Sequence, residues 1–359
     1  MVRATDGFAQ PINSFDSPTG SAHPEHMQVQ QALQVEEYDA DDAADVEAGH
    51  LVLEAARAVD SPFLPPSTVF RRTMNVRYGW DRSPVRYLLA RVDGQAVAVA
   101  DVELVEWDNR DLAWMYLVVD PAHRRHGYGS ELLAHVLELG GQVSRTKFGA
   151  GAWETPAAAG FAAQHGFVVA SEEIYRVQAP QELPAGFLDA AYAEAVAHAG
   201  DYELVRIEGH APEELLPAVA EITAAINDAP LDDLDIEDEV FPVERIRNYE
   251  TATTDSGHRL YRLVARHRTT GEVAGHTAVA VDTEQPQLGH QHDTSVMRAH
   301  RGHRLGLLLK AEMGRWLAEA EPQVTSVDTW NAESNQHMIA INERLGYRAR
   351  GRELDFQRR

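Results

Sequence analysis

The chain has 359 residues, of which 56 are acidic and 32 are lysine or arginine, so its formal net charge at pH 7 is −24. Such a negative surface repels nucleic acids and anionic membranes, and neither is expected as a partner. The sequence contains no cysteine, which excludes disulfides, thiolate nucleophiles and cysteine-ligated zinc and fits a cytoplasmic location. The chain is longer than a typical single domain, and its length suits two domains.

The N-terminal segment, residues 1–28, is polar and rich in Gly, Pro and Ser. This composition predicts a disordered arm, and the lack of an apolar core segment argues against a secretory signal. The rest of the sequence contains no run of about 18 apolar residues, so no membrane-spanning helix is predicted.

After this arm, the two halves of the chain show the same series of elements by hydrophobic periodicity. In the first half we predict helices over residues 41–58, 67–78 and 130–140 and strands over 86–92, 95–103 and 112–119. In the second half we predict helices over 212–227, 243–251 and 307–320 and strands over 202–207, 259–266, 273–281 and 287–296. Residues 180–200 read as a loop and an Ala-rich helix. We therefore predict domains at 29–180 and 201–359, joined by a linker helix at 181–200.

The most informative stretch is VVDPAHRRHGYGS, from Val118 to Ser130, in which a strand, a turn and a helix start follow one another. Its glycines let a ligand approach the backbone closely. The first N–H groups of the helix and the helix dipole form an anion site that suits a pyrophosphate, and Arg124 and Arg125 add positive charge. A Gly-rich turn of this kind, taken alone, is explained equally well by a steric need for glycine.

A partial second copy, RGHRLG, begins at Arg301, about half a chain length after Arg124. That spacing is typical of a duplicated domain rather than of a short repeat. The copy has Arg304 at the place of Gly127. This arginine still offers its backbone N–H, and its side chain could reach a phosphate or could crowd the turn.

Together with the strand before it, the first motif resembles the coenzyme A signature of the GNAT superfamily, Arg/Gln-x-x-Gly-x-Gly/Ala. Arg124, Gly127 and Gly129 match this signature, and Arg301 and Gly306 match it in the second half. A second family landmark, a strand, loop and helix closed by a Leu-Gly-aromatic turn, is matched at residues 329–347 and, in part, at 155–167. The resemblance covers nearly the whole chain, and the second motif is similar to that of tandem proteins of the mycothiol synthase type.

This resemblance implies an α/β (α+β) fold of two tandem GNAT domains, each a mixed, mostly antiparallel sheet flanked by helices. It also implies acetyl-CoA as the acyl donor, held by the turn and by strand backbone where the motif strand splays from its neighbour. The residues implied to contact coenzyme A in the first half are Leu117, Val118, Val119, Arg124, Arg125, His126, Gly127, Tyr128, Gly129 and Ser130. In the second half they are Ser295, Val296, Arg301, Gly302, His303, Arg304, Leu305, Gly306 and Leu307, with Asn331 and Asn335 as helix-capping or cofactor-binding residues.

The implied reaction is attack of a neutral amine on a thioester, which a general base assists. Many GNAT enzymes carry an acid tyrosine four residues before the Gly-aromatic turn, but this chain has Ala162 and Asn342 there. His290, His292 and Asp293 on the second motif strand are candidate bases, and a solvent-facing or structural role is the alternative for each. The predicted catalytic set is Asp293, His292 and Asn342. No metal is predicted, although a histidine cluster lies nearby.

Two further features have a structural and a functional interpretation. Residues 227–239 form a strongly acidic loop, which we interpret as a solvated loop, with recruitment of a cationic amine as the sharper alternative. Trp114 and Tyr116 alternate on the first motif strand and either wall a pocket or pack under a helix.

The resemblance to the GNAT superfamily implies an N-acetyltransferase that moves an acetyl group from acetyl-CoA to a primary amine of a small molecule by direct attack. We expect the second half to carry the chemistry and the first half to bind acyl-CoA or to be structural. The alternative is a non-catalytic acyl-CoA-binding or sensor protein. An unrelated nucleotide-phosphate binder is disfavoured, because neither half has a P-loop or a strand-leading Gly-x-Gly-x-x-Gly.

Overall fold

The computed structural model describes residues 32–358, and the arm predicted for residues 1–28 lies outside them. The first half contains, in chain order, β1 (Gln34–Tyr38), α1 (Ala43–Asp60), α2 (Val69–Tyr78), β2 (Val85–Val92), β3 (Gln95–Glu103), β4 (Leu112–Val119), α3 (Tyr128–Gln142), β5 (Lys147–Trp153), α4 (Pro156–Gln164) and β6 (Val168–Gln178). A connecting helix, α5 (Phe187–Val196), follows. The second half contains β7 (Tyr202–Glu208), α6 (Leu216–Ala224), α7 (Val243–Asp255), β8 (His258–His267), β9 (Val273–Asp282), β10 (Leu288–Val296), α8 (Leu305–Ala320), β11 (Ser326–Ala332), α9 (Gln336–Arg344) and β12 (Arg348–Arg358).

Side chains cap several of these helices, which explains where they begin. Thr155 accepts a hydrogen bond from the N–H of Ala158 at the start of α4, where Pro156 takes the first helical position. Asn335 accepts from the N–H of Met338 at the start of α9, so the capping interpretation of Asn335 is confirmed.

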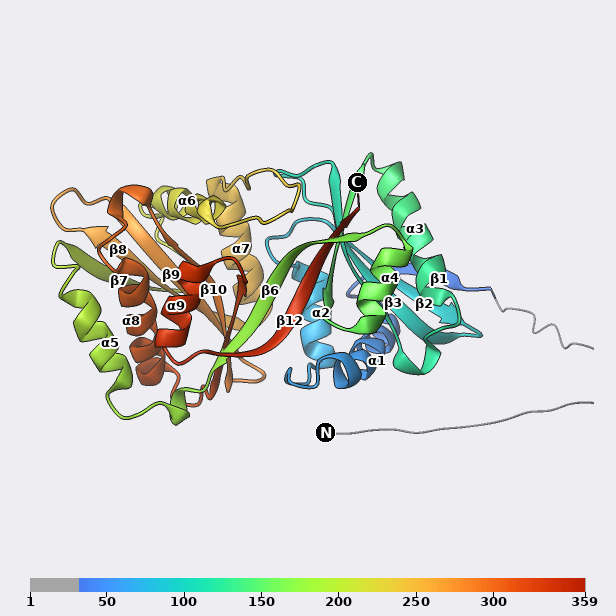
Figure 1. Ribbon diagram of the computed structural model, residues 1–359, viewed down its shortest axis with the longest axis horizontal. Coiled ribbons are helices and arrows are strands. Elements are labelled where there is room, and N and C mark those ends of the chain that lie inside the picture. Colours follow the sequence, from blue (N-terminus) through green and yellow to red (C-terminus); the bar gives the residue numbers. More distant parts are fainter. Residues whose placement is uncertain (1–31, 359) are drawn as a thin grey trace, which may run out of the picture. The chain divides into compact units, whose positions relative to one another are not determined.

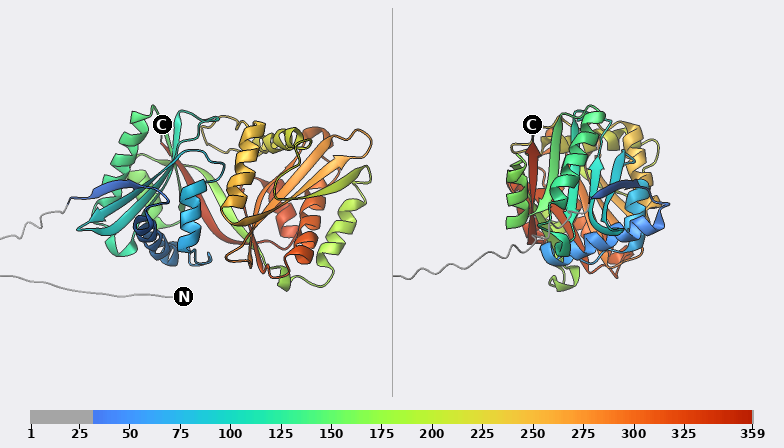
Figure 2. Two further views of the ribbon diagram at one scale, coloured as in Figure 1. Left: turned by 180° about the vertical axis from the view of Figure 1, so that it is seen from behind. Right: turned by 90° about the vertical axis from the view of Figure 1, so that its right-hand side faces the viewer.

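Across the described residues, twelve strands form one sheet in the order β1-β2-β3-β4-β5-β12-β6-β11-β10-β9-β8-β7 (Figure 1). Two neighbouring pairs, β4 with β5 and β10 with β11, are parallel, and the other pairs are antiparallel. Helices cover both faces of the sheet (Figures 1 and 2). The predicted fold class, mixed and mostly antiparallel sheets flanked by helices, is confirmed.

The two halves exchange their last strands. β12 ends the second half, yet it pairs with β5 and β6 of the first half, whereas β6 pairs with β11 of the second half. Figure 1 shows these two long strands crossing the middle of the molecule side by side. Each half therefore completes its sheet with a strand from the other, and the domains that we predict as continuous segments share these two strands.

Alternating residues along the strands build a separate core on each face. In the first half, Ala98, Ala100 and Val102 of β3 pack with α3 and α4, whereas Val99 packs with α1 on the opposite face. In the second half, Leu263 of β8 belongs to the large cluster under α5 and α8, and its neighbour Val264 packs with α6 and α7. Because the sheet is buried on both faces, its helices and strands are held in fixed relative positions.

Arginines on α7 and α2 join the two halves by polar contacts. The buried guanidinium of Arg245 on α7 lies 2.7 Å from the carboxylate of Asp81 and 2.8 Å from that of Asp108, both in the first half. Arg71 on α2 reaches Asp282 at 2.8 Å. Breaking a buried pair leaves an uncompensated charge, so these contacts hold α2 and α7 in a defined position over the sheet.

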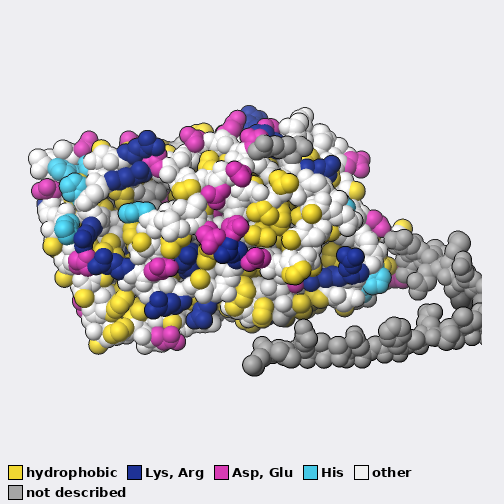
Figure 3. Space-filling model, viewed as in Figure 1, with side chains coloured by type: hydrophobic (Ala, Val, Ile, Leu, Met, Phe, Trp, Pro, Cys, Tyr) yellow, Lys and Arg dark blue, Asp and Glu magenta, His cyan; other side chains and the backbone are white. Residues whose placement is uncertain are grey.

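The acidic loop is not simply solvated, which corrects that part of our interpretation. Asp232 accepts a hydrogen bond from Ser171 at 2.7 Å, and Asp235 lies 3.2 Å from the ammonium of Lys147. Asp228 pairs with Arg298 and Arg301. Much of its charge is therefore used to fasten the loop to the first half and to the second-half turn. On the face seen in Figure 3, acidic and basic side chains are interspersed, so the net charge produces no single acidic patch there.

Candidate active site

The glycine-rich turn follows the same backbone path in both halves, with a glycine and an arginine exchanged. The residue before each helix has left-handed backbone geometry: Gly127 with φ 89° before α3 and Arg304 with φ 55° before α8. Two residues earlier, Arg125 has φ 68° and Gly302 has φ 89°. Arg304 thus fits the turn without distorting it, and its side chain pairs with Glu194. The first N–H groups of α8 remain available to an anion.

The two signature arginines fold back onto their own strands. Arg124 donates from Nε to the carbonyl of Val119 at 3.1 Å and pairs with Asp60. Arg301 donates in the same way to the carbonyl of Val296 at 3.2 Å, and its Nη2 lies 2.5 Å from Asp228. These arginine side chains are engaged by protein groups at the turn, which leaves the helix N–H groups as hydrogen-bond donors for an anion.

The strands beside the second turn open into a splay. β10 pairs with β11 only from Leu288 to His290, and the two strands separate beyond that point. The register of β10 against β9 also shifts between Gln291 and Thr294, a β-bulge that takes the backbone at residues 292–293 out of the regular ladder. β4 pairs with β3 without such a shift. The bulge leaves a residue of β10 without a ladder partner on β9, and β4 has no such residue against β3.

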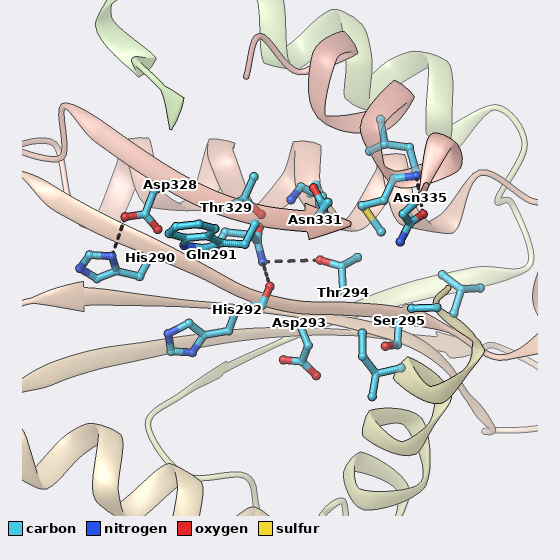
Figure 4. Close-up of a pocket in the computed structure, with 18 of the residues that line it drawn as sticks. His290, Gln291, His292, Asp293, Thr294, Ser295, Asp328, Thr329, Asn331 and Asn335 are labelled. Atoms are coloured by element: carbon cyan, nitrogen blue, oxygen red, sulfur yellow. Dashed lines mark hydrogen bonds and ion pairs between the residues drawn. The ribbon is translucent and has the colours of Figure 1, made fainter. Parts of the chain in front are cut away.

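A cavity of about 1150 Å³ follows this splay from the second turn to the last β10–β11 pair. Most of the predicted second-half cofactor residues line it, namely Ser295, Val296, Arg301, Gly302, Arg304, Leu305, Gly306, Leu307, Asn331 and Asn335. Figure 4 shows His290 and Asp328 at one end of the opening and Asn335 toward the other. His303 is not among the lining residues, and its ring lies 5.5 Å from that of Tyr202.

His290 and Asp328 form a hydrogen-bonded pair at the closed end of the splay. The Nδ1 atom of His290 lies 2.9 Å from Oδ2 of Asp328, and both residues line the cavity. Burial alone would lower the pKa of His290, but the charge and hydrogen bond of Asp328 outweigh burial and raise this pKa above its ordinary value. A hydrogen bond at Nδ1 leaves Nε2 of the neutral ring as a proton acceptor.

The other two strand candidates, His292 and Asp293, have properties that make them poor bases. His292 contacts the hydroxyl of Tyr249 at 2.5 Å, and burial lowers its pKa to about 3. Burial would raise the pKa of Asp293, but His276, whose Nε2 lies 2.8 Å away, outweighs burial and holds this pKa well below the usual range. A base works best with a pKa near the working pH, so His290 is the stronger candidate.

Asn342, also predicted as catalytic, is fully buried behind the cavity wall. Its Nδ2 donates to Oδ1 of Asn331 at 2.5 Å, and Asn331 lines the cavity. Within residues 32–358, its own Oδ1 has no hydrogen-bond partner. The position therefore suits a residue that orients Asn331 more than one that touches the reacting atoms.

Lys310 is a cavity residue that the sequence analysis missed. Its side chain is 5% exposed, lines the cavity, and places Nζ 4.9 Å from the centre of the Tyr347 ring. Among the described residues it has no ion-pair partner, and burial lowers its pKa to about 7. The equivalent position in the first half is Leu133, a core residue. The sequence signal that could have identified Lys310 is a lysine within the apolar run LGLLLKAEM.

The predicted first-half residues surround the turn between β4 and α3. Ser130 contacts Nε2 of His165 at 2.9 Å, and the ring of Tyr128 stacks on that of His126. A Cβ atom at Gly129 would lie 3.3 Å from both Phe161 and Val119, so packing as well as ligand access favours glycine there. Trp114 lies over Gly149, whereas Tyr116 lines a second cavity.

Residues 32–358 contain neither a metal-binding cluster nor a membrane-spanning helix. No group of three or more His, Asp or Glu side chains is placed to hold a metal ion, and His300 instead contacts the hydroxyl of Tyr202 at 3.0 Å. None of the helices in this range has the length and apolar character needed to cross a membrane.

Comparisons with known proteins agree with this fold. Residues 54–167 match the model of the Acetyltransferase (GNAT) family. A tandem GNAT protein from the clavulanic acid biosynthesis pathway, solved without AcCoA, superposes with a TM-score of 0.75 at 25% identity, over 91% of this chain and 98% of that one. A GCN5-related N-acetyltransferase from Sphaerobacter thermophilus superposes with a TM-score of 0.63 at 16% identity, over 91% and 95% of the chains. A search of curated protein sequences finds no significant match.

Proposed function

Since this chain is a tandem member of the GNAT acetyltransferase family, we propose that it moves an acetyl group from acetyl-CoA to a primary amine of a small molecule by direct attack. We place the reaction in the second half and the protein in the cytoplasm. The one observation that carries this proposal is the second-half cavity, which joins a helix N-terminus, a bulged strand and a His–Asp pair in a single space.

Cofactor binding follows from the residues along this cavity. The N–H groups of Leu305, Gly306 and Leu307 at the start of α8 suit a diphosphate, and the splayed edges of β10 and β11 suit the amide groups of a pantetheine arm. Acetyl-CoA supplies a thioester carbonyl that is open to nucleophilic attack. Beside the bulge, backbone N–H groups of β10 would stabilise the negative charge that develops on the carbonyl oxygen.

Proton transfer can be assigned to residues on the two sides of the splay. As the amine nitrogen bonds to the carbonyl carbon, Nε2 of His290 accepts the proton that this nitrogen loses, and Asp328 stabilises the imidazolium. The carbon–sulfur bond then breaks, and the ammonium of Lys310 protonates the departing thiolate. Lys310 would thus supply the acid that is absent at Asn342. This assignment replaces His292 and Asp293 as our proposed bases.

The proposed function is tested by incubating the full chain with acetyl-CoA and a panel of small primary amines, while following thiol release and acetylated product. We expect thiol release that depends on an amine. Tight binding of acetyl-CoA by calorimetry without product from any amine would favour the alternative, a non-catalytic acyl-CoA-binding or sensor protein.

Replacing His290 with glutamine (His290→Gln) should lower kcat/KM for the amine by about 10²–10³-fold, the usual contribution of a general base. His292→Gln serves as the matched comparison and should lower kcat/KM less than about tenfold, because a pKa of about 3 makes His292 a weak base. An equal loss in both variants would contradict the assignment.

The pH profile tests the role of Asp328 separately. His290 must be neutral to accept a proton, so activity should rise with pH through its raised pKa. Asp328→Asn removes the charge that raises this pKa, and the acid limb of kcat/KM should move to lower pH as the maximum falls. Arg71 and Asp282 also act on the pKa of His290, and the charge of His290 acts on His258 and His292; all four residues remain in place. An unmoved acid limb would mean that another group titrates.

A further inference from the structure

A second cavity, of about 650 Å³, lies between the two halves. Its walls come from α2, β2, β3 and β4 of the first half and from α7, β8 and the segment after α6 of the second. It shares lining residues with the reaction cavity: Asn75, Gly79, Trp80, Ile226 and Asp293. The ring of Trp80 lies 4.6 Å from that of His292 and 5.2 Å from that of Tyr249. The two cavities therefore meet beside the bulge of β10.

The cations that line this second cavity are already compensated by protein carboxylates. Arg72 contacts Asp101 at 2.6 Å, and Arg262 pairs with the fully buried Glu250. Arg245 is surrounded by the carboxylates of Asp81, Asp108 and Glu239, at 2.7, 2.8 and 3.0 Å. An anionic ligand would have to displace one of these buried partners, which is unfavourable.

Glu103 at the end of β3 is different, because among the described residues no ion pair or hydrogen bond is made by its carboxylate. Burial, together with the charges of Asp101 and Asp81, raises its pKa to about 7. Aromatic side chains, namely Tyr87, Tyr116, Trp80 and Phe241, line the same cavity. A lone carboxylate among aromatic rings favours an ammonium group, which gains an ion pair and contacts with the ring faces.

We propose that the second cavity is the distal part of the acceptor site and holds an ammonium group of the acceptor against Glu103, while a second amine of the same molecule enters the reaction cavity beside the bulge. This inference rests on the proposed function and narrows its substrate class to small molecules with at least two amino groups. It gives the first half a role in acceptor recognition, because Glu103, Tyr87 and Tyr116 come from its strands.

The test compares a series of linear α,ω-diamines of increasing length with monoamines of the same chain length, at saturating acetyl-CoA. The wild-type protein should show a KM at least about tenfold lower for the best diamine than for its matched monoamine. Glu103→Gln should raise KM for that diamine by about tenfold or more, with kcat and the KM for acetyl-CoA little changed. Glu106→Gln removes an exposed charge three residues away and should leave both KM values unchanged.

A binding measurement separates this inference from the proposed function. The best diamine alone, without acetyl-CoA, should raise the melting temperature of the wild-type protein and not that of Glu103→Gln. Acetyl transfer with no preference for diamines, or a preference that survives in Glu103→Gln, would overturn the inference while the acetyltransferase stands. Thermal stabilisation by the diamine without transfer to any amine would instead contradict the proposed function and leave the ammonium site standing.

Discussion

Replacing Gly306 with aspartate (Gly306→Asp) is expected to lower kcat/KM for acetyl-CoA by about 100-fold or more, equivalent to roughly 2.7 kcal/mol. The new carboxylate would stand among the first N–H groups of α8, where it repels a diphosphate. The fold should tolerate the change, because acidic residues in the first turn of a helix interact favourably with its dipole. The nearest obstacle to the new Cβ is the flexible end of Ile341, at 3.1 Å. Steady-state kinetics and calorimetric titration with acetyl-CoA provide the measurement.

Two companion variants make this result interpretable. Gly160→Asp adds the same charge on α4, where a Cβ meets no atom within 4 Å, and should leave turnover unchanged. Gly129→Asp makes the equivalent change in the first-half turn, and we expect it to reduce the number of acetyl-CoA molecules bound while turnover persists. Loss of turnover in Gly129→Asp but not in Gly306→Asp would move the reaction to the first half.

Replacing Lys310 with methionine (Lys310→Met) should lower kcat by about 10²-fold and leave the affinity for acetyl-CoA nearly unchanged. Methionine keeps the length of the side chain and removes the proposed proton donor of the thiolate. In the wild-type protein activity should fall as the pH rises above about 7, where the ammonium loses its proton. This basic limb should be absent in the variant, and the pH dependence of kcat provides the measurement. The other titratable or charged residues that line this cavity are Arg71, Tyr175, Asp228, His258, His290, His292, Asp293, Arg301, Arg304, Asp328, His337 and Arg344. The ring of Tyr347 contacts Lys310 directly.

Stability gives Lys310→Met an independent readout. The folded-state pKa of Lys310 lies below its ordinary value, so at pH 7 burial of the ammonium opposes folding, and this penalty is largest at low pH. The variant should therefore melt at a higher temperature, by about 2–4 °C for each kcal/mol gained. Leu133→Met, at the equivalent core position, should change neither kcat nor its pH profile. A variant that is stabilised but fully active would show that Lys310 takes no part in the reaction.

Local patterns were sufficient to predict most of the fold. Alternating apolar residues located β3 at its observed bounds, Gln95–Glu103, and the turn chemistry placed the start of α3 within two residues. β1 was missed because its five residues, QVEEY, show little apolar alternation. The exchange of β6 and β12 was beyond such reasoning, because a strand pattern records which face is buried and not which neighbouring strand it pairs with.

The backbone turn of the candidate site was predicted from the sequence, whereas the proton-transfer residues were not, for a similar reason. The backbone turn could be recognised because glycine and helix-start signals are local, and its second-half residues other than His303 line the main cavity. The proton-transfer groups depend on partners distant in sequence: Asp328 raises the pKa of His290, whereas burial lowers that of His292. His290 and His292 lie on the same face of β10 but differ in how well they accept a proton. The alternation of residues along the strand does not reveal this difference.

The exchange of β6 and β12 also affects how the chain can fold during its synthesis. Because β12 follows the whole first half in the chain and lies between β5 and β6, the first half remains an incomplete sheet with an open edge until β12 has been synthesised. Unpaired edges of this kind are prone to association with other chains. Neither half is therefore expected to be stable and soluble when it is expressed alone. A gene split at the linker would leave the first half without β12 and the second half without β6.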